Sequence, residues 1–323
     1  EPVWQNTLSA DYIWSQVTET GSLLVSTEKS LLNIDPETGE TLWERQDMAD
    51  LAPFNVRAIA GTPLLLVNEH DGTIPPHSQL QVINIMSGES LWDTGRVMAS
   101  NLIAIPVPAH DLVLFAADHS GAALEGARQD LKPGTYITGF ELSSGKVLYD
   151  SRQDLLAKAM RHPSDTSGSW IPDMDLSGHQ APVIEGDIIY LPFVGVTAMN
   201  LKTGEVLWEA PFKTTINGWK LTAAPLQIVD DVIYASGDGK ILALNKLTGE
   251  TLWETKVGRK YLIPELLVTG DQVLGRIGGT FSNGKDLGQV APFGVVALNR
   301  ADGSQRWLWK KAKKSITNMA WLE

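Results

Sequence analysis

The chain has 323 residues, of which 43% are hydrophobic and 20% charged, and its 38 Asp and Glu against 26 Lys and Arg give a formal net charge of −12. This composition is typical of a soluble globular protein, and the negative charge disfavours nucleic acids and anionic lipid surfaces as partners. The absence of cysteine excludes disulfides, thiol nucleophiles, iron–sulfur clusters and Cys-ligated zinc. No apolar stretch approaches the roughly 18 residues that a membrane helix needs, so no direct membrane span is expected.

Six segments along the chain share one pattern, in which an apolar run ends in a turn with glycine and an aromatic residue follows four positions later. The pairs are Gly39 and Trp43, Gly88 and Trp92, Gly145 and Tyr149, Gly204 and Trp208, Gly249 and Trp253, and Gly303 and Trp307. Successive glycines are 49, 57, 59, 45 and 54 residues apart. This period is too long for a helical solenoid unit and fits a four-stranded blade with loops. We therefore predict an all-β fold, a β-propeller of four-stranded antiparallel blades.

The fifth repeat shows the expected blade most clearly. Its strands are predicted at residues 224–229, 232–236, 241–245 and 251–255, because β-branched and apolar residues fill these runs and Gly, Asp and Asn fill the turns between them. Each turn glycine is expected to take a positive φ. Each tryptophan is expected to pack between neighbouring blades, and Tyr149 should replace it in the third blade with its hydroxyl at a partner or in solvent.

The two ends of the chain carry partial repeats. Residues 3–7, Val-Trp-Gln-Asn-Thr, resemble the outer strand of another blade, and residues 316–322 resemble the inner strand that opens a further one. We interpret residues 1–323 as a single β-propeller domain that lacks part of its closing blade, so that the intact propeller has seven or eight blades. The alternative is a six-bladed ring sealed by its terminal strands.

The long insertions are expected on one face of the propeller. In a meander of strands A, B, C and D, the A–B and C–D turns lie at one end, and the B–C and D–A connections lie at the other. The former are short throughout, whereas the latter include the B–C loops 68–79, 117–135 and 277–292 and the D–A connection 151–180. Because long loops on a rigid scaffold usually carry binding, we predict that this long-loop face binds a protein partner.

The candidate binding residues are aromatic, acidic or basic side chains in these insertions. They are Glu69, His70, His119, Trp170, Asp173, Asp175, His179, Trp219 and Arg276. Trp170 and Trp219 lie outside the repeated motif, so they are candidate anchors for a partner, with burial against their own loop as the alternative. Asp173 and Asp175 resemble the first half of a calcium loop, but turn formation explains them better, and we expect no metal.

No catalytic residue is expected from these motifs. The histidines at positions 70 and 119 each stand beside a carboxylate, yet neither neighbourhood supplies a nucleophile with an evident base and oxyanion donor. We also find no glycine loop that would cradle a phosphate.

The run A-L-N/D-x-x-T-G-x-x-L-W resembles the repeat of the pyrroloquinoline-quinone-like β-propellers across the six units. This superfamily includes quinoprotein dehydrogenases and the non-catalytic propeller lipoprotein of the outer-membrane β-barrel assembly machinery. The repeated residues are structural, so the resemblance is specific for the fold and much less so for activity.

The resemblance implies a non-catalytic, monomeric, protein-binding scaffold without a cofactor, in envelope or outer-membrane protein assembly. Its place would be periplasmic or otherwise extracytoplasmic, with lipid anchoring through a removed N-terminus. One alternative is a sensory or recruiting ectodomain of a larger protein. Another is a quinone- and Ca²⁺-dependent dehydrogenase, although alcohol-oxidising members often stack the quinone on a vicinal cysteine pair that cannot form here.

Overall fold

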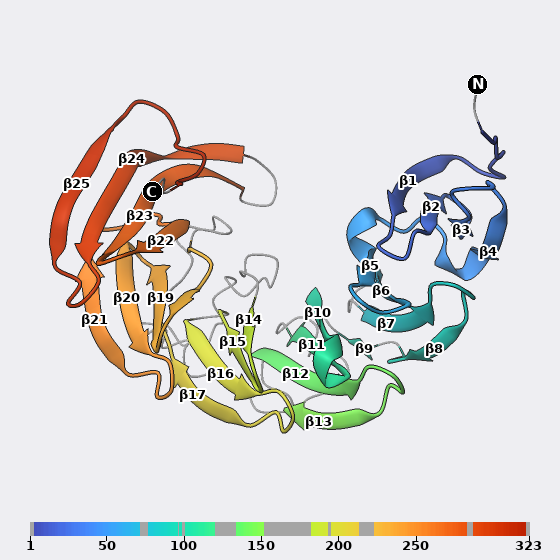
Figure 1. The fold of residues 1–323 in the computed structure, drawn as a ribbon, viewed down its shortest axis with the longest axis horizontal. Coiled ribbons are helices and arrows are strands. Elements are labelled where there is room, and N and C mark those ends of the chain that lie inside the picture. The colour runs from blue at the N-terminus through green and yellow to red at the C-terminus, as the bar shows by residue number, and fades with distance from the viewer. Residues whose placement is uncertain are drawn as a thin grey trace. The chain divides into compact units, whose positions relative to one another are not determined.

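The computed structural model describes residues 3–71, 77–95, 97–98, 101–119, 134–151, 182–192, 195–212, 223–282 and 287–320. These residues form strands β1 to β25 and three short 3-10 helices, at Gln46–Met48, Pro53–Asn55 and Pro108–His110, with no α-helix among them (Figure 1). The predicted all-β class is therefore confirmed. None of the described residues belongs to a helix long and apolar enough to cross a membrane.

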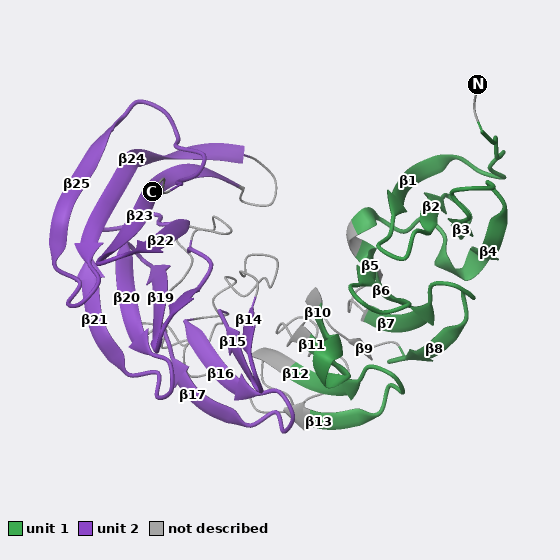
Figure 2. Ribbon diagram, viewed as in Figure 1, with its two compact units in different colours: residues 1–153 green, residues 154–323 purple. Residues whose placement is uncertain are grey.

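Residues 1–153 form the first of two compact units (Figure 2). The unit contains three antiparallel sheets whose strands follow chain order from the inner to the outer edge. Sheet 1 consists of β1 (Tyr12–Val17), β2 (Leu23–Thr27), β3 (Leu31–Ile34) and β4 (Thr41–Arg45). Sheet 2 consists of β5 (Val56–Ile59), β6 (Leu64–Asp71), β7 (His77–Asn84) and β8 (Ser90–Asp93), with β9 (Val97–Met98) paired to β7. Sheet 3 consists of β10 (Asn101–Val107), β11 (Leu112–His119), β12 (Gly134–Glu141) and β13 (Val147–Ser151).

Residues 154–323 form the second unit, again with three four-stranded meanders. Sheet 4 consists of β14 (Val183–Glu185), β15 (Ile188–Leu191), β16 (Val196–Asn200) and β17 (Val206–Ala210). Sheet 5 consists of β18 (Gln227–Val229), β19 (Val232–Gly237), β20 (Lys240–Asn245) and β21 (Thr251–Lys256). Sheet 6 consists of β22 (Glu265–Thr269), β23 (Gln272–Ser282), β24 (Leu287–Asn299) and β25 (Gln305–Ala312). These are the blades that the repeats predict.

The two central strands of each sheet are apolar on both faces because sheets pack against each other. All four residues of β3 are buried, as are four of the five residues in β2 and β16. In the second unit, one buried cluster joins sheets 4 and 5 through residues such as Tyr190 and Ile233, and another joins sheets 5 and 6 through residues such as Ile241 and Ile277. Alternation between polar and apolar residues therefore survives only on the outer strands, such as β4 and β21.

All six repeat turns have the predicted backbone. The φ angles of Gly39, Gly88, Gly145, Gly204, Gly249 and Gly303 lie between +70° and +74°. This left-handed conformation penalises any residue with a β-carbon. Before each turn, the pairing of the third and fourth strands shifts register, which sets the aromatic residue opposite Asn33, Val82, Gly139, Ala198, Ala243 or Ala297.

Five tryptophans bind the turn of the next repeat in the same way, and we call this arrangement the tryptophan lock. The indole covers the turn glycine of the next repeat, and its Nε1 donates to the carbonyl three residues before that glycine. The locks join Trp4 to Gly39 and Pro36, Trp43 to Gly88 and Ile85, Trp92 to Gly145 and Leu142, Trp208 to Gly249 and Lys246, and Trp253 to Gly303 and Arg300. The donor–acceptor distances are 2.7, 2.8, 2.7, 3.2 and 3.0 Å in that order. The predicted packing of tryptophan between blades is confirmed for these repeats.

Two aromatic residues of the repeat behave differently. Trp307 was expected to be a buried plug but is 46% exposed, against 9% for Trp43 and Trp92, because no turn within the described residues covers its ring. Tyr149 lies over Gly139 of its own sheet, where a β-carbon would come within 2.7 Å of the ring. Burial raises the pKa of the Tyr149 phenol above its ordinary value.

The chain ends differ from the prediction as well. Residues 3–8 and 315–320 form no strand, although strands were expected at 3–7 and 316–322; residues 321 and 322 of the second lie outside the described part. Trp4 nevertheless locks onto Gly39, so the segment keeps the outer-strand contact without the strand pairing.

Candidate functional site

The described parts of the B–C insertions of sheets 2, 3 and 6 are strand rather than loop. Sequence reasoning placed loops at 68–79, 117–135 and 277–292, but β6 and β7 pair out to Asp71 and His77, β11 and β12 out to His119 and Gly134, and β23 and β24 out to Ser282 and Leu287. The polar and Gly-rich composition that suggested loops is accommodated within paired strands, in which Ser78 and Phe281 are buried. A strand hairpin presents its side chains more rigidly than a loop does.

The hairpins place three of the candidate residues on strands. Glu69 is partly buried on β6 and pairs with Gln79 of β7, and His70 follows it opposite Ser78. His119 ends β11, opposite Gly134. Burial raises the pKa of the Glu69 carboxyl, the nearby charge of Asp47 raises it further, and Arg45 lowers it.

Arg276 on β23 is engaged in the structure of its own sheet. Its Nε lies 2.6 Å from Glu265 on β22, and both side chains are mostly buried, at 12% and 23% exposure. Its Nη1 donates to the carbonyls of Gly278 and Ile316, at 3.2 and 2.9 Å. Any contribution of Arg276 to binding therefore competes with these bonds.

The remaining candidates, Trp170, Asp173, Asp175, His179 and Trp219, lie outside the described residues. Their place on the long-loop face stays a prediction. Within the described residues, no group of three His, Asp or Glu is close enough to hold a metal ion.

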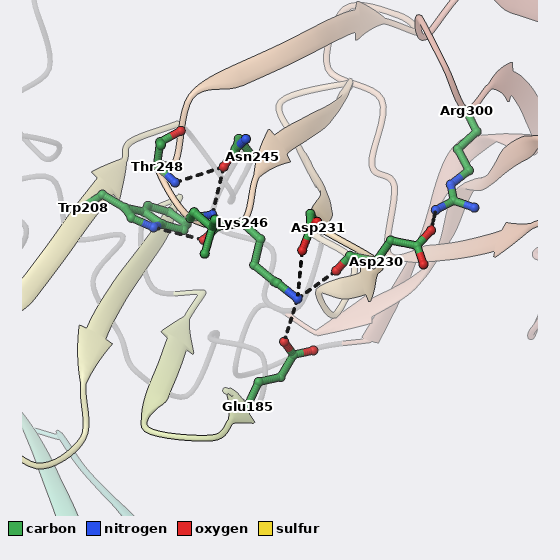
Figure 3. Close-up of polar contacts among 9 residues, drawn as sticks. Glu185, Trp208, Asp230, Asp231, Asn245, Lys246, Thr248 and Arg300 are labelled. Atoms are coloured by element: carbon green, nitrogen blue, oxygen red, sulfur yellow. Dashed lines mark hydrogen bonds and ion pairs between the residues drawn. The ribbon is translucent and has the colours of Figure 1, made fainter.

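The opposite end of the second unit, where the short turns lie, carries a polar seam that the sequence reasoning missed. Figure 3 shows the Lys246 ammonium directed toward sheet 4 and toward the first turn of sheet 5. Its Nζ lies 3.1 Å from Glu185, 3.8 Å from Asp231 and 2.8 Å from the carbonyl of Asp230. The hydrogen bond with Glu185 is the main cause that raises the pKa of Lys246.

Arg300 repeats this arrangement one sheet later. Its guanidinium pairs with Asp230 (Figure 3). It also donates to the Tyr234 hydroxyl at 3.0 Å, and both bonds raise the pKa of Arg300. Arg306 pairs with Asp271 nearby, and this hydrogen bond lowers the pKa of the Asp271 carboxyl.

These side chains line a cavity of about 660 Å³ between sheets 5 and 6. Leu252 and Trp253 form an apolar wall of this cavity, and Asp302 stands among its acidic residues. Both arginines of the cavity are paired with carboxylates: Arg300 joins sheet 6 to Asp230 of sheet 5, whereas Arg306 pairs with Asp271 within sheet 6.

One signal in the sequence points to this seam. Lys246 and Arg300 both stand three residues before a turn glycine, at the position whose carbonyl accepts the tryptophan lock. The first four repeats have uncharged residues there, namely Pro36, Ile85, Leu142 and Leu201. A cation at this otherwise apolar position therefore distinguishes the fifth and sixth repeats from the first four.

The recurring turn, lock and four-stranded sheet are matched by a known family. The model of the family described as Outer membrane protein assembly factor BamB matches residues 79–236 and 217–320. The chain belongs to this family. No curated protein matches the sequence.

One solved structure agrees with this BamB-family assignment at the level of the fold, and two others are reported beside it. BamB from Moraxella catarrhalis is similar with a TM-score of 0.50 and 17% identity, over 98% of this chain and 80% of that one. Sqt1 from Saccharomyces cerevisiae has a TM-score of 0.48 and 11% identity, over 94% and 74% of the two chains. Quinohemoprotein alcohol dehydrogenase from Comamonas testosteroni has a TM-score of 0.47 and 10% identity, over 90% and 58%. The predicted β-propeller of the pyrroloquinoline-quinone-like, BamB-like type is confirmed by the family match and the first of these structures.

Proposed function

We propose that this BamB-family chain is a non-catalytic scaffold that binds proteins outside the cytoplasm during outer-membrane protein assembly. The observation that carries the proposal is the family match over residues 79–236 and 217–320. Because the conserved fold elements of a propeller are structural, the function depends on what its surface binds.

The proposed binding surface is the long-loop face, to which the β6–β7, β11–β12 and β23–β24 hairpins contribute. Each of these hairpins extends from a sheet whose central strands are buried. A rigid, preorganised surface loses little conformational entropy when it binds, which favours affinity for a protein partner. Leu287, at the start of β24, is 78% exposed and supplies an apolar contact at the end of its hairpin.

Trp170 and Trp219 are the proposed anchors of the partner. Large aromatic side chains dominate the energetics of most protein interfaces. Both residues lie in insertions that the repeat motif does not require. We further propose that the protein is monomeric on its own and is held in the cell envelope by a lipid at its natural N-terminus, which cell fractionation would test.

Site-specific photo-crosslinking in the native cell tests the binding surface. Probes replace Trp170 and Trp219, and a matched control probe replaces Lys202, an exposed residue in the short turn that precedes Gly204. We expect a protein adduct from the first two probes, identifiable by mass spectrometry, and none from the control.

Adducts from the Lys202 probe alone would move the interface to the short-turn face and contradict the proposed surface. Adducts from no probe, in a protein that remains folded and at its normal abundance, would contradict the scaffold function itself.

A further inference from the structure

Two residues of the sixth repeat depart from the repeat pattern at one cavity. Arg300 stands where the first four repeats have an uncharged residue. Arg306 stands three residues after the turn glycine, at the position that the other five repeats fill with Leu42, Leu91, Leu148, Leu207 and Leu252. Both arginines line the cavity of about 660 Å³ between sheets 5 and 6. The two departures therefore change the lining of the same cavity.

Protein groups already occupy both arginines. All three nitrogens of each guanidinium donate hydrogen bonds to oxygens of the protein. Arg300 pairs with Asp230, and Arg306 pairs with Asp271. The Nε of Arg306 also donates to the side chain of Asn299. Because an anion could bind the arginines only by displacing these groups, the arginines hold the aspartates in place and do not prepare the cavity for an anion.

Negative charge is in excess around the cavity. Its lining contains two arginines and four aspartates, and these aspartates are Asp230, Asp231, Asp271 and Asp302. The side chain of Asp231 is 82% exposed, and Lys246, which lies 3.8 Å from it, is shared with Glu185. Hydrogen bonds from Ser304 lower the pKa of the Asp302 carboxyl, which keeps it anionic. The carboxylates of Asp231 and Asp302 are therefore available to a cation.

The lining also indicates which kind of cation fits. A metal ion does not suit it, because the described residues contain no group of three His, Asp or Glu close enough to hold one. Leu252, which is 51% exposed, and Trp253 add apolar surface beside the carboxylates. The side chains of lysine and arginine combine an aliphatic stem with a charged end, so they match both kinds of surface.

The buried hydroxyl of Tyr234 provides an independent contact. Tyr234 lines the cavity and is 1% exposed. Its oxygen accepts a hydrogen bond from Arg300 at 3.0 Å, but its own proton is donated to no group among the described residues. A buried donor without an acceptor costs free energy, and a main-chain carbonyl can supply the acceptor. The cavity thus has a contact for the side chain and for the main chain of a basic residue.

We infer that this cavity binds a basic residue of a polypeptide segment, with its charged end at the carboxylates of Asp231 and Asp302. The aliphatic stem lies on Leu252, and the main-chain carbonyl accepts the Tyr234 proton. This site is distinct from the proposed long-loop face. Lys202, the control position for that face, lies in the turn of sheet 4 and does not line the cavity.

NMR titration of the whole protein with the peptide acetyl-Leu-Lys-Leu-amide at low salt tests the inference. A matched peptide with Gln in place of Lys is the control for charge, and pentylamine is the control for an amine without a carbonyl. We expect the Lys peptide to bind several-fold more tightly than either. Asp231→Asn and Asp302→Asn should each weaken its binding by about three- to fivefold, the loss expected for one exposed ion pair. Asp187→Asn, which removes a carboxylate paired with Lys202 in sheet 4, should leave the affinity unchanged.

Three results would overturn the inference. Equal affinity for the Lys and Gln peptides would show that charge does not select the ligand. Unchanged affinity in both Asp231→Asn and Asp302→Asn, with unfolding temperatures equal to that of the parent, would place the peptide elsewhere. Pentylamine binding as tightly as the Lys peptide would show that no main-chain contact is made. None of these results bears on the long-loop face, which the crosslinking experiment tests separately.

Discussion

The joint between sheets 2 and 3 and the joint between sheets 5 and 6 use the same lock but fill it with different chemistry. Around Trp92 the filling is apolar, because the ring stacks on Phe140 with centroids 5.6 Å apart and Leu142 is buried. Around Trp253 the filling is polar, because Arg300 replaces the leucine and reaches Tyr234 and Asp230. The backbone geometry of the lock therefore tolerates either apolar or polar side chains around the indole. The two joints should differ in their contribution to the free energy of unfolding and in how far salt changes that contribution.

The largest expected effect is removal of an indole. Replacing Trp92 with Ala should destabilise the protein by about 3–5 kcal/mol, because the change empties a buried site and loses the bond to the Leu142 carbonyl. The matched change Trp253→Ala should cost less, since that ring is only partly buried. Urea unfolding of both variants measures the difference, and equal losses would show that the lock itself, not its filling, sets the strength.

A smaller expected effect distinguishes the stability that comes from the contact of an indole with its turn glycine from the cost of a left-handed backbone. Gly88 and Gly61 both have a φ of +72°, but a β-carbon on Gly88 would lie 2.7 Å from the Trp43 ring, whereas one on Gly61 would meet nothing within 4 Å. Gly61→Ala should cost about 1–2 kcal/mol from the left-handed conformation alone. Gly88→Ala should cost distinctly more in the same unfolding experiment. Indistinguishable values would mean that the indole moves aside freely.

The stability that the charged side chains around Trp253 contribute should depend on the salt concentration. Arg300→Met should destabilise the protein by no more than about 1 kcal/mol, because its partner Asp230 is largely exposed. The loss should shrink at about 1 M salt, where the screening length falls to about 3 Å. Leu142→Met at the apolar joint is the control, and its effect should not change with salt. A loss at Arg300 that persists in high salt would show that packing of the side chain, rather than its charge, matters.

The smallest effect concerns the pH dependence of the first unit. The pKa of Glu69 is raised in the folded state, so the folded protein binds this proton more tightly than the unfolded chain, and stability falls as pH rises from the ordinary carboxyl range through the raised pKa. Glu69→Gln should therefore be slightly more stable than the parent at neutral pH and equal to it in acid. Thermal unfolding across this range measures the gap.

Asp47→Asn should change the stability at neutral pH in the opposite direction. The hydrogen bond from Arg45 lowers the pKa of Asp47, so its carboxylate stabilises the fold above the ordinary carboxyl range and loses that contribution as pH falls. Asp47→Asn should be less stable than the parent at neutral pH and converge with it in acid. The same direction of change in both variants would contradict the assigned environments.

The repeated residues were enough to predict the sheets. In the fifth repeat, the strand expected at 232–236 is β19 (Val232–Gly237), and the one expected at 251–255 is β21 (Thr251–Lys256). Local signals determine these elements, because glycine sets the turn and the β-branched runs set the strands. The strand expected at 224–229 shortened to β18 (Gln227–Val229), since residues before it belong to the connection between sheets.

The polar seam and the hairpins could not be derived in the same way. The partners Asp230 and Arg300 are separated by 70 positions in the chain, and only the stacking of sheets brings them together. The hairpin at 68–79 looked like a loop because Asn68, His70 and Asp71 are poor strand formers, and cross-strand pairing overrode their propensity. Among the candidate site residues, sequence reasoning placed Glu69 in a loop although it lies on β6, and it did not predict that Arg276 pairs with Glu265.

The tryptophan lock also bears on how such a chain can grow. The first, second, fourth and fifth repeats each carry a left-handed turn glycine and, four residues later, the tryptophan that covers the turn glycine of the next repeat. When one whole repeat is duplicated or lost, each remaining tryptophan of a lock still faces a turn glycine. The array can therefore change length by unequal recombination without a new contact between repeats having to evolve. Recombination between the turn glycine and the tryptophan of one repeat also preserves this contact, provided that the tryptophan still lies four residues after the glycine. Selection can therefore act on the hairpins of single repeats while the tryptophan locks between repeats stay unchanged.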